Sequence, residues 1–125
     1  MALCLDRLHQ VALHSDDLDR SRLFYEETLG ARFIALYEPP GLLFFEFSGV
    51  RLLLEAGAGK GTLYFQVPDI QATYEELVGR GVSFAGPPHV IFKDDDGTFG
   101  EAGLSEWMAF FEDPDGNTLA LASRQ

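Results

Sequence analysis

The feature that most constrains the fold is an internal repeat. Val11–Leu13 followed by Asp17 recurs 52 residues later as Leu63–Phe65 followed by Asp69. In each copy a helical pattern then runs to a glycine and a phenylalanine, with the second copy one residue shorter. Both copies continue into apolar segments bounded by turn residues. A chain with this repeat is expected to fold as two similar modules that pack their apolar faces in the same way.

Cap and turn residues divide both copies into the same elements. Asp17 and Asp69 each suit a helix N-cap, because a short carboxylate accepts amide hydrogens of the first helical turn. Three strands are expected after each helix, so the order βαβββ is written twice. Asp113–Asn117 is a turn in which proline, glycine and asparagine suit the backbone. The expected strands are 31–37, 42–47, 50–55, 82–85 continuing around 90–92, 106–111 and 118–122.

These residues resemble the vicinal oxygen chelate superfamily, which includes glyoxalase I, extradiol dioxygenases and the fosfomycin and bleomycin resistance proteins. Three segments carry the resemblance: VALHSDDLDRSRLFYEETLGARF, LYFQVPDIQATYEEL and WMAFFEDPDGNTLAL. The resemblance implies an α+β fold, with two tandem βαβββ modules forming a curved half-open barrel that has its helices outside. It covers one domain, 1–125, with module one at about 5–56 and module two at about 62–122. Because this fold hosts many reactions, it does not fix the chemistry.

Charge and composition exclude several classes of function. The chain has 9 Lys and Arg against 20 Asp and Glu, a net charge of -11, which argues against a nucleic-acid partner because phosphate binding needs clustered cations. No apolar run approaches the ~20 residues of a membrane span, so no membrane partner is expected. With Cys4 as the single cysteine and no signal-peptide pattern, a cytoplasmic location is expected.

In the superfamily a metal, where present, is held by one residue from the first and last strand of each module. The positions matched to these are Gln10, Glu55, Thr62 and Ala120. Gln10 and Glu55 are acceptable ligands, but Thr62 is a poor one and Ala120 has no donor atom. A divalent ion normally needs three or four protein donors, so no tightly bound metal is expected. The alternative is a divalent metal at Gln10 and Glu55, completed by waters or by a loop residue such as His89.

Strand alternation places polar and aromatic side chains on one face of the expected sheets, with His9 on the opposite face. Glu55 would suit proton transfer next to a carbonyl and is the candidate catalytic residue. His14 would recognise a carboxylate and Arg51 would clamp one, although each also suits an exposed strand position. The candidate ligand-binding residues are Gln10, His14, Arg51, Thr62, Tyr64, Gln66 and Trp107.

A glycine- and aspartate-rich insertion, Lys93–Gly103, distinguishes the second copy. Its Asp94–Gly97 run lacks the alternate spacing and terminal glutamate of an EF-hand, so we expect a solvated turn rather than a calcium site. The surrounding glycines suit either a mobile lid or a surface insertion.

Together these observations favour a glyoxalase-like or bleomycin-resistance-like protein that encloses a small organic molecule. The resemblance also implies a homodimer. Two alternatives stay open: a metal-assisted lyase, isomerase or dioxygenase using Gln10 and Glu55, and a non-catalytic protein that sequesters an antibiotic or a metabolite. Whether the chain is an enzyme is left open by its sequence.

Overall fold

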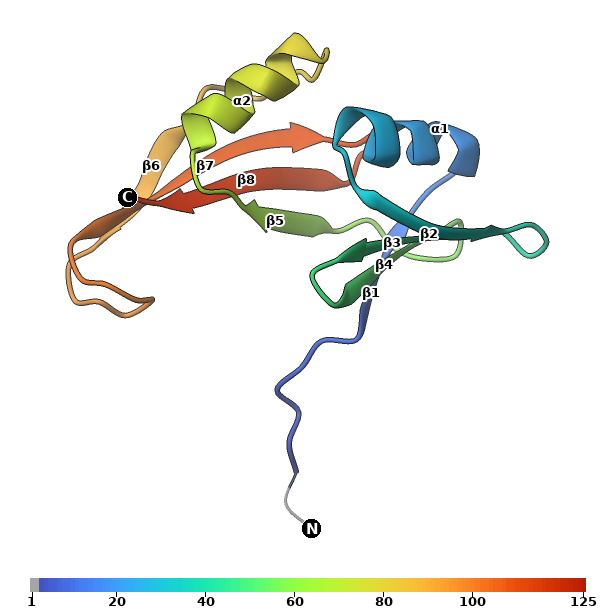
Figure 1. The fold of residues 1–125 in the computed structure, drawn as a ribbon, viewed down its shortest axis with the longest axis horizontal. Coiled ribbons are helices and arrows are strands. Elements are labelled where there is room, and N and C mark those ends of the chain that lie inside the picture. Colours follow the sequence, from blue (N-terminus) through green and yellow to red (C-terminus); the bar gives the residue numbers. More distant parts are fainter. Residues whose placement is uncertain (1–2) are drawn as a thin grey trace. The chain divides into compact units, whose positions relative to one another are not determined.

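The computed structural model describes residues 3–125, which divide into two compact units at residues 60 and 61 (Figure 1). Each unit has the order βαβββ, so the prediction of two such modules is confirmed. Unit 1 contains β1 (Gln10–His14), α1 (Leu18–Arg22), the π-helical segment η1 (Leu23–Thr28), β2 (Arg32–Tyr37), β3 (Leu42–Phe47) and β4 (Val50–Glu55). Unit 2 contains β5 (Thr62–Gln66), α2 (Ile70–Gly79), β6 (His89–Asp94), β7 (Leu104–Glu112) and β8 (Thr118–Arg124).

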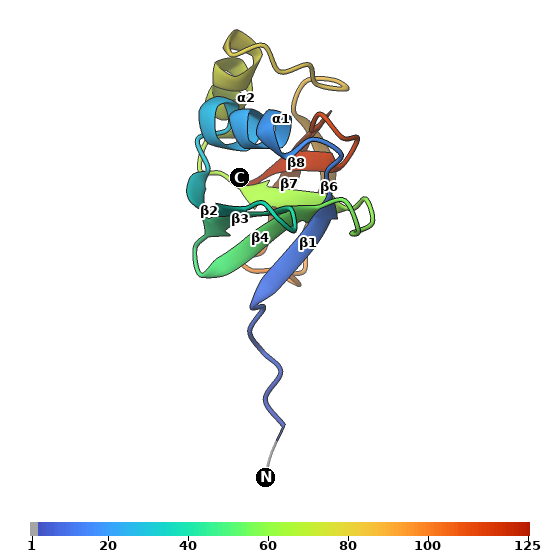
Figure 2. The ribbon, with the colours of Figure 1, turned by 90° about the vertical axis from the view of Figure 1, so that its right-hand side faces the viewer.

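The two sheets share one topology. The strand order is β1-β4-β3-β2 in unit 1 and β5-β8-β7-β6 in unit 2 (Figure 2). In each sheet the first and last strands of the unit pair in parallel, and the other pairs are antiparallel. The registers also correspond, because Ala12 pairs with Leu53 as Tyr64 pairs with Ala120. Leu53 and Ala120 are therefore equivalent positions of the repeat.

Both predicted helix starts are confirmed. The Asp17 carboxylate accepts the Arg20 amide at 3.1 Å, and the Asp69 carboxylate accepts the Ala72 amide at 3.0 Å. After Arg22 the first helix widens into η1, where the Leu29 amide donates to the Phe24 carbonyl at 3.0 Å. The apolar residues of this helix are irregularly spaced in the sequence, as expected where an α-helix passes into a π-helix. No helix in the part of the chain that the structure describes is long and apolar enough to cross a membrane.

Each unit builds its core between its helix and one face of its own sheet. In unit 1 the fully buried Tyr25 ring lies 5.5 Å from the Phe45 ring, which in turn contacts Phe33. In unit 2 Phe84 lies between Tyr74 and Phe111, with ring centroids 4.7 and 4.9 Å apart. Since successive strand side chains alternate, the other face of each sheet is left for different residues.

The segment after α2 departs from the prediction. Residues 82–85 form no strand and contribute one isolated bridge, between Phe84 and Phe111. Regular pairing begins at His89, directly after Pro87 and Pro88, which have no amide hydrogen to donate to a ladder. The predicted strand around 90–92 is therefore the middle of β6.

The prediction of a solvated turn holds for Asp95 and Asp96, which are exposed turn residues, but it is wrong for Asp94. Its side chain is 2% exposed and accepts the amides of Thr98 at 2.8 Å and Phe99 at 2.9 Å. Arg124 of β8 donates to the same carboxylate at 3.0 Å. The Phe99 amide lowers the pKa of Asp94; burial opposes this, but the Thr98 amide and Arg124 reinforce it. The sequence spacing excludes an EF-hand in this segment, but it does not reveal that Asp94 holds the loop that follows it through hydrogen bonds to Thr98 and Phe99.

Phe45 and Phe44 provide a matched test of which sheet face carries the core. Phe45→Ala removes a fully buried ring and should lower the free energy of unfolding by about 3–5 kcal/mol. Phe44→Ala removes the half-buried neighbour that points to the other face, so its effect should be clearly smaller. Urea unfolding of the two variants and the wild type measures the difference. Equal losses would contradict the assignment of the core to the helix-bearing face.

Candidate functional site

The sheet face without the helix carries most of the predicted site residues of unit 1. Gln10 pairs with Arg51 at the start of β1, and His14 pairs with Glu55 at its end. All four alternate with the apolar residues that face the helix, such as Leu13 and Leu52. The second pair lies four positions further along the strands than the first, a distance of about 13 Å. The face therefore has two polar ends, which we call the Gln10–Arg51 end and the His14–Glu55 end.

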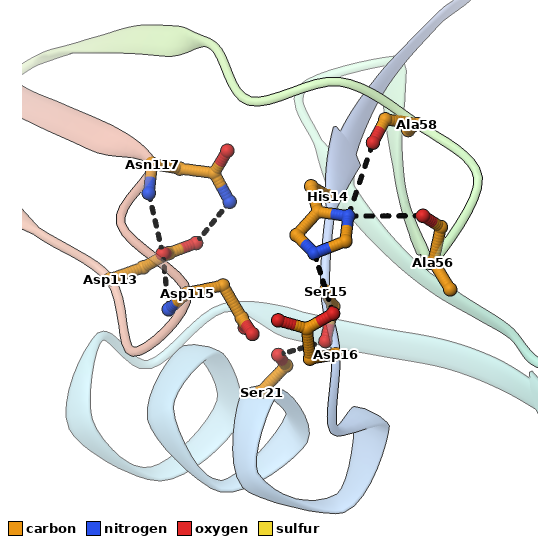
Figure 3. Close-up of polar contacts among 9 residues, drawn as sticks. All are labelled: His14, Ser15, Asp16, Ser21, Ala56, Ala58, Asp113, Asp115 and Asn117. Atoms are coloured by element: carbon orange, nitrogen blue, oxygen red, sulfur yellow. Dashed lines mark hydrogen bonds and ion pairs between the residues drawn. The ribbon is translucent and has the colours of Figure 1, made fainter.

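His14 is held by three oxygen atoms. Its Nδ1 lies 3.0 Å from the Ala56 carbonyl and 3.2 Å from the Ala58 carbonyl, while Nε2 lies 2.8 Å from an Asp16 carboxylate oxygen (Figure 3). Carbonyls and ionised carboxylates accept hydrogen bonds, so this arrangement favours a ring that donates from both nitrogens. Partial burial lowers the pKa of His14, but Asp16 and the two carbonyls raise it by more, and the net shift is upward. The contacts of His14 therefore favour its protonated form and tie its ring to the loop after β4.

Arg51 is held differently. Its Nη2 donates to Nε2 of His9 at 2.7 Å, and its guanidinium carbon lies 5.8 Å from the centre of the Phe44 ring. Its neighbour on β3, Glu46, pairs instead with Arg32 at 2.7 Å. Among residues 3–125, Arg51 has no carboxylate within ion-pair distance.

The contact with Arg51 corrects the expected orientation of His9. The sequence pattern placed the His9 side chain on the face opposite Gln10, yet its ring reaches a side chain of the Gln10 face. His9 precedes the first residue of β1, so strict strand alternation does not govern its ring. Sequence reasoning also missed Phe44, although its position two residues from Glu46 on β3 places it on the same face as Arg51.

In unit 2 the corresponding face carries Thr62, Tyr64 and Gln66. They pair with Thr118, Ala120 and Ala122 of β8. The Tyr64 ring is 58% exposed and meets the Phe110 ring edge-on at 6.3 Å. Within the described part of the chain none of the three side chains has a hydrogen-bond partner. This face therefore offers aromatic surface beside polar groups that the protein itself leaves unsatisfied.

The turn before β8 fixes this register. One Asp113 carboxylate oxygen accepts the backbone amides of Asp115 and Asn117, and the other accepts the Asn117 side-chain amide (Figure 3). The side-chain oxygen Oδ1 of Asn117 in turn accepts the Gly61 amide at 3.1 Å, directly before β5. The predicted turn therefore also aligns the starts of β5 and β8.

Trp107 is not part of this surface. It pairs with Ser123 of β8, and Ser123 is buried on the helix-bearing face together with Leu121 and Leu119. The structure therefore corrects the expectation that Trp107 and Tyr64 line one surface. The reason is that side chains alternate along β7. Phe110 lies on the same face as Tyr64, whereas Trp107, three residues before Phe110, lies on the opposite face.

The residues at the expected metal positions do not fit a divalent ion. Gln10 lies at the start of β1 and Glu55 at the end of β4, beside His14, so the two are about 13 Å apart along the strands. Register makes Leu53, rather than Glu55, the counterpart of Ala120, and neither side chain has a donor atom. His89 lies on the edge strand three strand spacings, about 14 Å, from Thr62. In residues 3–125 no group of three His, Cys, Asp or Glu residues could hold a metal.

Comparisons with known proteins agree with the fold. A family model described as Glyoxalase/Bleomycin resistance protein/Dioxygenase superfamily matches residues 7–121. Lactoylglutathione lyase from Agrobacterium tumefaciens is 19% identical, with a TM-score of 0.74 over 94% of this chain and 93% of that one. An antibiotic binding protein from a Streptomyces species is 21% identical, with a TM-score of 0.77 over 99% and 100%. No curated protein sequence matches the chain.

The ion pair of His14 predicts how stability depends on pH. Because the folded-state pKa lies above the ordinary 6.5, His14 stabilises the fold fully below pH 6.5 and loses this contribution as pH rises through the raised value. The stability difference between wild type and His14→Gln should therefore be largest near pH 6 and shrink at alkaline pH. Urea unfolding from pH 5.5 to 9 measures it.

His89→Gln is the control, since that exposed ring bonds only a carbonyl two residues away in the described chain. Its stability difference from wild type should stay flat across the same pH range. A flat profile for His14→Gln as well would refute the assignment of a folded-state cation at His14.

Proposed function

The chain belongs to the glyoxalase/bleomycin resistance protein/dioxygenase superfamily, and we propose that it binds a small organic molecule without a tightly bound metal. The observation that carries this proposal is the set of polar side chains on the helix-free faces that make no hydrogen bond to the described protein. Its members are Gln10, Glu55, Thr62, Tyr64 and Gln66.

Their surroundings suit a small-molecule site. Polar groups that fix a ligand usually stand among apolar and aromatic surface. In unit 1 Leu53 and Phe44 lie between the Gln10–Arg51 end and the His14–Glu55 end. In unit 2 Tyr64 and Phe110 form the aromatic part of the face. Each face by itself therefore matches an organic molecule with a flat apolar body and a few polar substituents.

We assign Glu55 the role of proton acceptor if the bound molecule is turned over. Its carboxylate makes no hydrogen bond or ion pair with residues 3–125, although it lies in register with the His14 cation. A carboxylate without a protein partner is free to contact a ligand, and proton transfer next to a carbonyl needs such a base. Unchanged turnover in Glu55→Ala would remove this assignment.

The proposal includes a homodimer in the cytoplasm. Leu3, Leu5 and Leu8 lie on an extended segment before β1 and are largely exposed (Figure 1). Exposed apolar side chains in series favour association, because contact with another surface removes them from water. Sedimentation equilibrium tests the assembly, and a monomer at all concentrations would contradict it.

Metal content and ligand binding test the proposed function directly. Protein purified without a chelating tag should contain no stoichiometric metal, and calorimetric titration with nickel, manganese, zinc or iron(II) should give no heat of tight binding. Tight binding of one metal ion per chain would overturn the metal-free proposal. In that case a donor beyond those identified on the helix-free faces would have to complete the site.

The neutral probe 2-naphthol should bind wild type, and Tyr64→Ala should weaken its binding roughly three- to tenfold through the loss of an aromatic contact. Trp107→Phe is the matched control, because Trp107 lies on the other face of the same sheet. Calorimetry compares the three proteins. Equal weakening by both substitutions would place the probe elsewhere, and no binding to wild type would oppose the proposed function.

A further inference from the structure

We propose that the ligand carries a carboxylate and that Arg51, held in place by His9, is the group that binds it. This inference rests on the proposed function and names the chemical class of the ligand at the Gln10–Arg51 end of the unit 1 face.

The first step is the pairing of the cations. Acidic residues outnumber Lys and Arg by 20 to 9, so most cations have a carboxylate nearby. Arg51 is an exception, since the nearest acidic neighbour in register, Glu46, is engaged by Arg32. Within the described chain five other cations form ion pairs: Arg22–Glu26, Arg32–Glu46, Arg80–Glu76, Lys93–Asp95 and Arg124 with Asp94 and Glu106.

The second step is that a neutral group holds Arg51. A guanidinium has donors and no acceptor, so His9 Nε2 must accept the 2.7 Å hydrogen bond and carry no proton. This contact orients the guanidinium without neutralising its charge. One N–H is used, and the remaining N–H groups of the planar fork stay available for the two oxygens of a carboxylate.

The third step is the surface around the guanidinium. The Phe44 ring lies 5.8 Å from its central carbon, and Leu53 stands next to Phe44 in register. The exposed Gln10 amide is the lateral neighbour of Arg51 on β1 and has no hydrogen-bond partner in residues 3–125. An apolar ring beside a fixed cation matches an aromatic or branched carboxylic acid better than a small inorganic anion.

The fourth step is the space beside His9. A hollow of about 460 Å³ is lined by Arg7, Leu8 and His9 before β1 and by Ser48, Gly49 and Val50 at the turn into β4. This volume lies within the range of small-molecule sites. Arg51 is not among the lining residues, but His9 lines the hollow and also bonds Arg51, so the hollow adjoins the Gln10–Arg51 end through His9. Arg7 adds a second cation at the same end of the unit.

The charge of the whole chain limits the ligand further. A net charge of -11 repels anions at long range, and the repulsion grows with the charge of the ligand. The single planar fork of Arg51 matches the two oxygens of one carboxylate, and a monocarboxylate meets less long-range repulsion from the chain than a dianion. We therefore assign a monocarboxylate with an apolar body rather than a phosphate ester.

The test compares 2-naphthoate with 2-naphthamide, which has nearly the same shape but no charge. Calorimetry on wild type should show the carboxylate binding at least about tenfold more tightly, since charge-assisted hydrogen bonds are stronger than neutral ones. Arg51→Gln should abolish this preference. Arg80→Gln is the charge-matched control, because its guanidinium is paired with Glu76 on α2 and its loss leaves the Arg32–Glu46 pair intact, and it should keep the preference.

A preference that survives in Arg51→Gln, or equal binding of the two probes to wild type, would overturn the assignment of Arg51. If both probes bind wild type equally, the proposed function stands but the assignment of Arg51 does not. If neither probe binds, the result opposes both the proposed function and the assignment of Arg51. Should Arg51→Gln fail to fold, Arg51→Lys and His9→Ala replace it. Arg51→Lys removes the planar guanidinium, and His9→Ala removes the side chain that orients it, so each variant should bind 2-naphthoate with a smaller preference over 2-naphthamide. An unchanged preference in both variants would overturn the inference.

Discussion

The parallel pairing of the first and last strands of each unit is the constraint on which the rest of the structure depends. It brings β1 next to β4 and β5 next to β8. The register is secured by apolar pairs on the helix-bearing face, such as Leu13 with Leu54 and Leu63 with Leu119. A slip of one residue would turn these side chains away from the core. The same register therefore fixes which polar residues share the opposite face.

The repeat and the capping residues predict the fold well because their signals are local. Asp17, Asp69 and the turn at Asp113 each act within five residues, and sequence spacing identifies all three. The misplaced residues depend on longer-range contacts. Asp94 is buried by the loop that follows it and by Arg124 from the last strand. The face of Trp107 depends on its register with Ser123, and sequence spacing within β7 does not reveal that pairing.

The sequence predicts which residues make up the candidate site better than it predicts the contacts that these residues make. Sequence alternation groups Gln10, His14, Arg51 and Glu55 on one face, and the pairing of β1 with β4 places them there together. The sequence does not show how the two cations differ. His14 is enclosed by oxygen atoms of its own unit, so its charge serves the loop after β4. Arg51 meets a neutral imidazole and an aromatic ring, so its charge remains available to a ligand.

Register also explains why the side chains at the expected metal positions do not form a set of donors. The family resemblance matched Glu55 and Ala120 to equivalent positions on the last strands of the two modules. Pairing shows that Leu53 occupies that place, because Ala12–Leu53 and Tyr64–Ala120 are the equivalent cross-strand pairs. Two apolar side chains therefore stand where the repeat would present donors. Neither of these two positions supplies a charged metal ligand, and the proposal that the unit 1 face recognises an organic anion rests on Arg51, whose planar guanidinium suits a carboxylate.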